Sequence, residues 1–220
     1  HVLTKPIIFL GPSLPMDEAL RILDADYRGP AKKDDFLRLM NLSEKCTIGF
    51  IDGVFLHDYP PSPIEVYSLV TKRYATLVRA GSLGALRAVE LERFGMIGIG
   101  MVFELYKNRI IDADDEVAVT FVQDQNILQS EAMIDIRFNL FLAYRLSIID
   151  YLCMRTLTTV AKSLYFPYRR YNDIVDIAEK RHPDMTEQLE HFREYISKNR
   201  DSLKARDSVH LLNYIKNNIV

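Results

Sequence analysis

Ser82 is the side chain in this sequence best placed to do chemistry, because it stands between an apolar run and a helical pattern. Residues 75–79 have the pattern of a buried strand, and residues 83–91 that of a helix with leucines along one side. A hydroxyl at such a corner lies where open α/β sheets bind ligands and where backbone N–H groups point outward. The layout is similar to the nucleophile elbow of hydrolases, although the G-x-S-x-G spacing is not met. The alternative is that Ser82 is only a helix N-cap.

The segments around Ser82 indicate how the chain must fold to present it. Short apolar runs alternate with helical patterns through the first half, which is typical of an α/β protein with a mainly parallel sheet. The expected strands are residues 7–10, 26–28, 47–51 and 75–79. The expected helices lie around residues 19–23, 36–40, 63–70 and 83–91. Right-handed crossovers would place the carboxyl ends of these strands at one edge of the sheet.

That edge should collect the loops that follow the strands, at residues 11–13, 30–33, 52–53 and 81–82. Asp52 ends a buried strand there. Its carboxylate could orient a lysine or a water molecule, or it could simply cap a turn. We therefore expect the candidate site at this edge.

The second half of the sequence has a helical pattern instead. Apolar residues recur at steps of three and four from Ile134 to Ile149, and a similar pattern continues from Ile174 onward. These stripes are typical of packing faces. We predict an α/β core at residues 1–125 that carries the candidate site, and a helical region at residues 126–220 packed on it.

Composition narrows the functional class. The chain has 220 residues and a formal net charge of −2, so it has no general attraction for nucleic acid or membranes. Its two cysteines, Cys46 and Cys153, lie in apolar settings and are expected to be buried and reduced, which suits the cytoplasm. No run is long and apolar enough to span a bilayer. We expect a cytoplasmic protein with no nucleic-acid or membrane partner.

Metal and nucleotide sites are poorly supported. The adjacent acids Asp114, Asp115 and Glu116 do not suit a three-ligand site on one regular face, and no histidine joins them. His57 is an isolated histidine in a loop. The glycines fit neither a Walker loop nor a G-x-G-x-x-G turn after a strand. We therefore expect no metal and no cofactor.

Several motifs, in order, resemble those of the TfuA family, the partner proteins of YcaO enzymes in peptide backbone thioamidation. The opening GPS turn, the PPA-x-x-GD segment, the IGIIDG strand, the SMGALRAAEL block and the DDEVAV segment are matched by residues 11–14, 29–35, 48–55, 82–91 and 114–119. The long block beginning at Ser82 is the most specific of these matches. The resemblance spans roughly residues 7 to 120.

The sequence departs from the family pattern at two places. Gly29 and Asp34 differ from the PPA-x-x-GD segment. Many members also carry His-Lys-Glu before the serine strand, whereas residues 63–66 are Pro-Ile-Glu-Val here. No role of that histidine or lysine can be carried over to this chain.

The resemblance implies a function in sulfur supply. Members are thought to hydrolyse the C-terminal thiocarboxylate of a small ThiS-like sulfur carrier protein, releasing sulfide near YcaO, and to help YcaO hold its peptide substrate. The family is associated with a Ser-Lys catalytic pair, in which Ser82 would be the serine by motif match. A non-catalytic adaptor that docks on YcaO and positions its substrate is the alternative function.

Chemistry narrows the choice of lysine, since the amine must be neutral and within hydrogen-bonding reach of the hydroxyl. Lys5 and Lys72 precede their strands and belong to the opposite edge of the sheet. Lys32 and Lys33 follow a strand-like segment and share the edge of Ser82. Lys32 is favoured because the turn before it fixes its approach. The alternative for each is a solvated surface charge.

Residues of the following helix would complete the site. Backbone N–H groups at its start, those of Leu83 and Gly84, could hold an oxyanion. Arg87 lies further along this helix and could bind the carboxyl terminus of the carrier. It could equally pair with Glu90 or Asp115.

Overall fold

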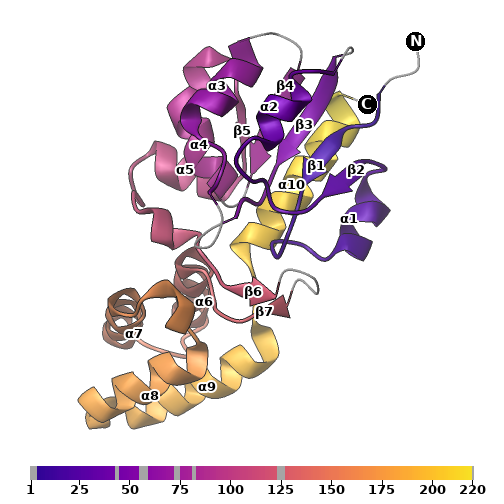
Figure 1. The fold of residues 1–220 in the computed structure, drawn as a ribbon. Coiled ribbons are helices and arrows are strands. Elements are labelled where there is room, and N and C mark those ends of the chain that lie inside the picture. Colours follow the sequence, from indigo (N-terminus) through magenta and orange to yellow (C-terminus); the bar gives the residue numbers. More distant parts are fainter. Residues whose placement is uncertain are drawn as a thin grey trace. The chain divides into compact units, whose positions relative to one another are not determined.

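A computed structural model describes residues 4–42, 45–54, 59–71, 75–80, 83–122 and 127–219, with the backbone alone for residues 75–80, Leu83 and Ile127. The chain forms two compact units (Figure 1). Unit 1 comprises residues 1–114 and 204–220, and unit 2 comprises residues 115–203. Within the described residues, no helix combines the length and apolar character needed to cross a membrane.

Unit 1 is built on a five-stranded sheet whose paired strands are all parallel, in the order β2-β1-β3-β4-β5. The strands are β1 (Ile7–Phe9), β2 (Asp26–Arg28), β3 (Cys46–Phe50), β4 (Ala75–Ala80) and β5 (Ile97–Ile99). The sheet confirms the predicted α/β class and the prediction that residues 7–10, 47–51 and 75–79 share one sheet. β5 extends it beyond the strands that the sequence predicted.

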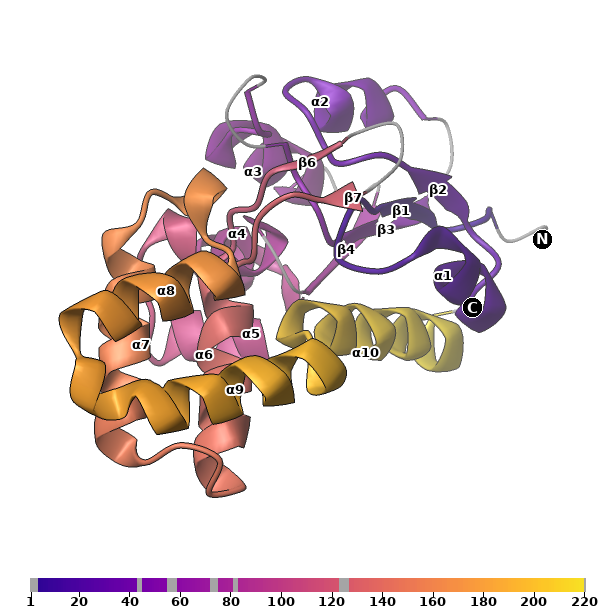
Figure 2. The same ribbon diagram turned by 90° about the horizontal axis from the view of Figure 1, so that it is seen from below.

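Helices cover both faces of this sheet (Figure 2). Alternate residues of its central strands are therefore buried on opposite sides. Ile7 and Phe9 pack with the apolar sides of α2 (Asp35–Leu39) and α3 (Pro63–Thr71), whereas Ile8 packs with helices on the other face. Those helices are α1 (Met16–Ile22) and α10 (Leu203–Asn218). The remaining helices of this unit are α4 (Leu83–Leu91), η1 (Glu92–Phe94) and α5 (Met101–Lys107).

α10 is tied to the amino end of α5 by Asp207. The Asp207 carboxylate accepts hydrogen bonds from the backbone N–H groups of Met101 at 2.8 Å and Val102 at 2.7 Å. Gly100 precedes them with φ of 103°, and a Cβ built there would lie 2.4 Å from the Asp207 side chain. Only glycine fits this approach without strain. The carboxylate therefore occupies the amino end of α5 and holds α10 against the sheet.

Unit 2 is mainly helical, as predicted for the second half. Its helices are α6 (Met133–Arg145), α7 (Tyr151–Ser163), η3 (Phe166–Tyr168), α8 (Tyr171–Arg181), η4 (Pro183–Met185) and α9 (Thr186–Asn199). A short antiparallel hairpin, β6 (Phe121–Val122) with β7 (Ile127–Leu128), precedes them, and η2 (Asp114–Glu116) spans the boundary of the units. One apolar core joins α6, α7, α8 and α9.

The division of the chain differs from the predicted regions. The boundary falls between Asp114 and Asp115, not at residue 125. The last helix, α10, returns to the α/β unit, where Leu211 and Ile215 pack with Ile8 of β1. A helical pattern reveals an apolar face but does not specify which unit that face covers.

Candidate active site

The Ser82 corner connects β4 to α4. β4 ends at Ala80 and α4 begins at Leu83. Gly81 and Ser82, which separate them in the sequence, lie outside the described residues, as do His57 and Lys72. The strand and helix on either side of Ser82 are thus as predicted.

Gly84 shows how closely α4 approaches the sheet. A Cβ built at Gly84 would lie 2.3 Å from the carbonyl oxygen of Phe50, the last residue of β3. Any larger side chain would therefore push the helix away from the strand. The close contact fixes the first turn of α4 at the carboxyl end of β3. This position agrees with the predicted edge.

Asp52 lies at the same edge, directly after β3, and is only 2% exposed. Its carboxylate accepts hydrogen bonds from the N–H of Gly11 at 2.9 Å and the N–H of Ser13 at 3.1 Å. The Ser13 hydroxyl donates a third, at 2.6 Å. Of the two roles left open for Asp52, the described contacts are those of a turn cap. We refer to Asp52, Gly11 and Ser13 as the Asp52 clamp.

The loop after β2 also reaches this edge. The Ala31 N–H donates to the Asp52 carbonyl at 2.9 Å, and the Val54 N–H donates to the Ala31 carbonyl at 3.0 Å. The sheet thus brings together residues 11–13, 30–33 and 52–53, as predicted. Asp34 has a left-handed backbone with φ of 70°. The family pattern has glycine at this position, and a left-handed backbone is the conformation that favours glycine.

The two candidate lysines have exposed side chains. The Lys32 N–H donates to the Asp35 carboxylate at 2.7 Å, and the Lys33 N–H donates to the Tyr59 carbonyl at 2.7 Å. Their backbone is therefore ordered at the predicted edge. The burial that would favour a neutral amine is not seen at either position.

Arg87 pairs with Glu90, which lies three residues further along α4 and is one of its two predicted partners. Its Nη1 lies 3.0 Å from both carboxylate oxygens of Glu90. The Arg87 side chain is only 16% exposed, and among the described residues its buried Nε has no acceptor. A buried donor without a partner is costly and is usually met by a water molecule or a ligand. The guanidinium can therefore receive a carboxylate or a water molecule.

The stretch that departs from the family pattern has a structural role at Glu65. The Glu65 N–H donates to the Ser62 hydroxyl at 3.2 Å, and the Glu65 carboxylate accepts from the Ser62 N–H at 3.4 Å. This is a capping box at the start of α3. The same carboxylate also accepts from the Phe36 N–H in α2 at 3.0 Å. Glu65 therefore joins α2 to α3.

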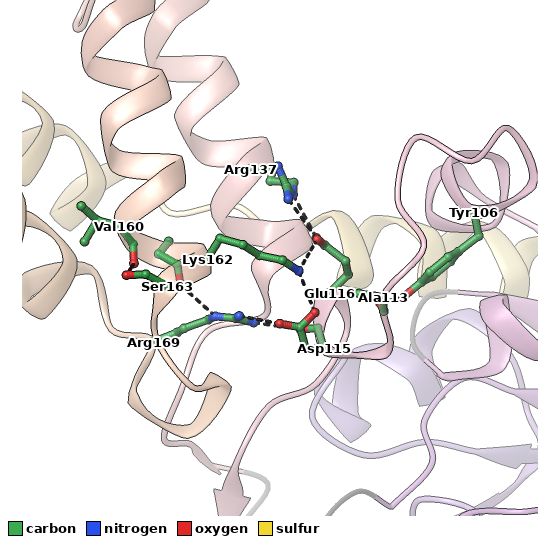
Figure 3. A network of polar contacts seen from close by, with 10 residues as sticks. Tyr106, Ala113, Asp115, Glu116, Arg137, Val160, Lys162, Ser163 and Arg169 are labelled. Carbon is green, nitrogen blue, oxygen red and sulfur yellow. Dashed lines mark hydrogen bonds and ion pairs between the residues drawn. The ribbon is translucent and has the colours of Figure 1, made fainter.

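Two of the three acids of the DDEVAV match, Asp115 and Glu116, belong to a network in unit 2 (Figure 3). Lys162 Nζ lies 2.7 Å from the Asp115 carboxylate and 2.9 Å from that of Glu116. Arg137 adds two hydrogen bonds to Glu116, and Arg169 pairs with Asp115 at 2.6 Å. Arg169 is 1% exposed, so the network ties the start of unit 2 to α6, α7 and the segment after η3.

Hydrogen bonds from basic side chains lower the pKa values of both acids in this network. Burial alone would raise the pKa of Glu116, but hydrogen bonds from Arg137 and Lys162 outweigh it and hold that pKa below its usual value. The pKa of Asp115 is likewise lowered, because hydrogen bonds from Lys162 and Arg169 outweigh its burial. Both groups therefore stay ionised as structural anions. No group of three or more histidine, cysteine or acidic side chains suited to a metal occurs in the described part of the chain.

Sequence reasoning missed two residues of the edge. Ser13 was placed there only as part of a turn, and its hydroxyl bond to Asp52 spans 39 positions. Asp207 was not singled out in the sequence. Neither pairing leaves a local signal, because each joins segments far apart in the chain. Cys46 and Cys153 are buried and free, as expected.

Comparison with known proteins agrees with these motifs. A search of curated proteins found no match. The family model described as TfuA-like protein matches residues 52–170, more than half of the 220-residue chain. The matched region begins at Asp52 and includes α4 and the acidic network of unit 2. The chain therefore belongs to the TfuA-like protein family.

Proposed function

We propose that this chain supports YcaO-dependent peptide thioamidation by hydrolysing the C-terminal thiocarboxylate of a ThiS-like sulfur carrier protein. The released sulfide would serve YcaO in the cytoplasm, and the chain would also help YcaO hold its peptide substrate. The observation that carries the proposal is the position of α4. Gly84 packs against the Phe50 carbonyl, so the family block that begins at Ser82 enters its helix at the carboxyl edge of a parallel sheet.

The reaction divides into two acyl transfers. Ser82 Oγ attacks the carbonyl carbon of the thiocarboxylate while its proton passes to a lysine amine. The carbon–sulfur bond breaks, sulfide leaves, and an ester joins the carrier to Ser82. Water then attacks the ester and releases the carrier with an ordinary carboxylate. N–H groups at the start of α4, at Leu83 and Gly84, would stabilise the oxyanion of each step.

Arg87 would hold the substrate during this reaction. Its guanidinium lies on α4, one turn beyond Leu83, and among the described residues its Nε has no acceptor. The negatively charged terminus of the carrier supplies such an acceptor. Asp52 would act at a distance, by fixing the turn at residues 11–13 through its three hydrogen bonds.

The adaptor is the second candidate function, and the lysines favour it. Lys32 and Lys33 are both exposed, whereas a general base needs an environment that stabilises its neutral form. The family's His-Lys-Glu is also replaced at residues 63–66. An adaptor would dock on YcaO and position its peptide without hydrolysing the carrier.

Incubation with a thiocarboxylated carrier protein separates the two functions. Sulfide release should be measured together with mass spectrometry of the carrier, whose thiocarboxylate should become a carboxylate. Ser82→Ala should reduce release by orders of magnitude if Ser82 is the nucleophile. As a cap it would cost only about 1 kcal/mol of stability. Ser68→Ala is the matched control, because Ser68 lies in α3 and its hydroxyl donates to the Ile64 carbonyl.

The lysines are tested in the same assay. Lys32→Ala should behave like Ser82→Ala if Lys32 is the base, and Lys33→Ala is the second test. Lys5→Ala is the control, since Lys5 precedes β1 and pairs with Asp24 at 2.8 Å. Normal release by both Lys32→Ala and Lys33→Ala would reject the choice of base. Absence of release by the unmodified chain would reject the hydrolase and leave the adaptor.

A further inference from the structure

The turn between α6 and α7 carries a dense group of exposed apolar side chains. Tyr144, Leu146, Tyr151 and Leu152 are 37%, 62%, 55% and 61% exposed, respectively. The rings of Tyr144 and Tyr151 lie 6.1 Å apart, so the two helices contribute to one surface. We call these four residues the hairpin tip. It lies at the turn that joins α6 to α7 in unit 2 (Figure 2).

A hollow of about 480 Å³ adjoins the hairpin tip along α7 and the end of α8. Tyr151 and Leu152 line it together with the basic side chains Arg155, Arg181 and His182. No acidic residue is among its described lining. The hollow is therefore apolar at one end and positively charged along its wall.

The two arginines are not committed to acids of the chain. Among the described residues, neither Arg155 nor Arg181 forms an ion pair, and both are exposed. Among the described residues, the Arg155 guanidinium donates to the Tyr151 hydroxyl at 3.3 Å and lies 5.9 Å from the centroid of the same ring. The acid next to the tip in sequence is Asp150, and its carboxylate accepts from the Cys153 N–H at 2.8 Å and the Gln188 amide at 3.0 Å. Asp150 therefore does not neutralise the wall.

We propose that the hairpin tip and its hollow are the docking surface for a protein partner that presents an apolar side chain flanked by carboxylates. Charge complementarity selects this occupant, since the wall offers two unpaired arginines and no acid. Tyrosine and arginine are also the residues that most often dominate binding energy at protein interfaces. Resting on the proposed function, the partner is the YcaO enzyme, and the surface is on unit 2, away from the Ser82 block in sequence.

Binding of the full chain to YcaO, measured by titration calorimetry, tests the surface. Arg155→Glu combined with Arg181→Glu should weaken binding at least about tenfold, and Leu152→Ser should weaken it similarly. Raising the salt concentration from about 0.1 to about 1 M should weaken wild-type binding. The difference in affinity between the wild type and the double variant should therefore become smaller. Sulfide release from free carrier should be unchanged in all variants, because none lies in the proposed catalytic site.

Two controls match these changes. Lys180→Glu makes the same kind of charge reversal on an exposed neighbour in α8 that does not line the hollow. Leu20→Ser removes an apolar side chain that is 53% exposed on α1 of unit 1. Both should bind YcaO like the wild type, and circular dichroism should show that all variants remain folded.

The outcomes separate this proposal from the hydrolase. Wild-type affinity in the hairpin-tip variants, or equal loss in the controls, would overturn the docking surface. Sulfide release without any YcaO binding would also overturn it while supporting the hydrolase. Tip-dependent binding without sulfide release would support the docking surface and reject the hydrolase.

Discussion

Removing the Asp52 carboxylate should lower the free energy of unfolding of unit 1 more than removing any single hydrogen bond nearby. Asp52→Ala would leave three buried donors without an acceptor, the N–H groups of Gly11 and Ser13 and the Ser13 hydroxyl. Each unsatisfied buried donor costs about 1–3 kcal/mol. Water entering the vacated space would recover part of this. We therefore expect a loss of about 3–5 kcal/mol from the free energy of unfolding, out of a usual total of about 5–15 kcal/mol.

Asp52→Asn gives a sharper test, because it keeps the shape of the side chain. One oxygen can still accept both N–H groups, and the new amide can donate to the Ser13 hydroxyl, which turns to accept. What is lost is the contribution of the negative charge, so we expect a smaller cost of about 1–2 kcal/mol. Ser13→Ala removes a single hydroxyl and should cost about 1 kcal/mol.

Urea unfolding followed by circular dichroism would measure these values, since the chain has no tryptophan. Hydrogen exchange of a peptide containing Gly11 and Ser13 would report on the clamp itself and separate it from the unfolding of unit 2. An Asp52→Ala variant within about 0.5 kcal/mol of the wild type would refute the clamp. If the Asp52→Asn variant instead lost far more sulfide release than its loss of folded protein explains, that result would favour the other role of Asp52, in which its carboxylate orients the lysine.

Three further changes follow from the geometry. Gly84→Ala should destabilise unit 1 by about 1–3 kcal/mol, measured by urea unfolding, because its Cβ would meet the Phe50 carbonyl at 2.3 Å. Asp34→Gly should be neutral or stabilising by up to about 1 kcal/mol in the same assay, whereas Asp34→Val should destabilise, because φ is 70° there. Acid should destabilise unit 2, because folding lowers the pKa values of Asp115 and Glu116. The stabilisation from these two carboxylates is complete above their ordinary pKa values of 3.8 and 4.5. It is lost as the pH falls through their lower pKa values in the folded protein. Glu116→Gln should flatten that loss in melting curves recorded across acidic pH.

The sequence predicted those features that have a local signal. Apolar runs bounded by glycine and aspartate located β1, β3 and β4, and parallel crossovers then placed Asp52 and the loop at residues 30–33 at one edge. The two strands of the hairpin in unit 2 were missed, because each is only two residues long. The return of α10 was missed because its apolar face could equally have packed in either unit.

The candidate site was predicted to the level of its edge and no further. Lys32 and Lys33 do lie on the loop that was expected, but their exposure depends on what covers that loop, which no pattern in the sequence encodes. The role of Asp52 was likewise left between two alternatives. Its three donors come from a turn about 40 positions earlier, and such a long-range pairing has no periodic signal.

The buried acids of unit 1 limit what chemistry its edge can perform. Among the described residues they are Asp52, Glu65 and Asp207, and each accepts backbone N–H groups from a different segment of the chain. A carboxylate held in this way supports a loop or a helix end and is poorly placed to take a proton from a substrate. These three acids are therefore poor candidates for the general base of the proposed hydrolase, whereas the proposed Ser-Lys pair uses a hydroxyl and an amine. If Ser82→Ala released sulfide normally, the chain would still hydrolyse the carrier, and its nucleophile would have to be a group other than Ser82 and these three acids.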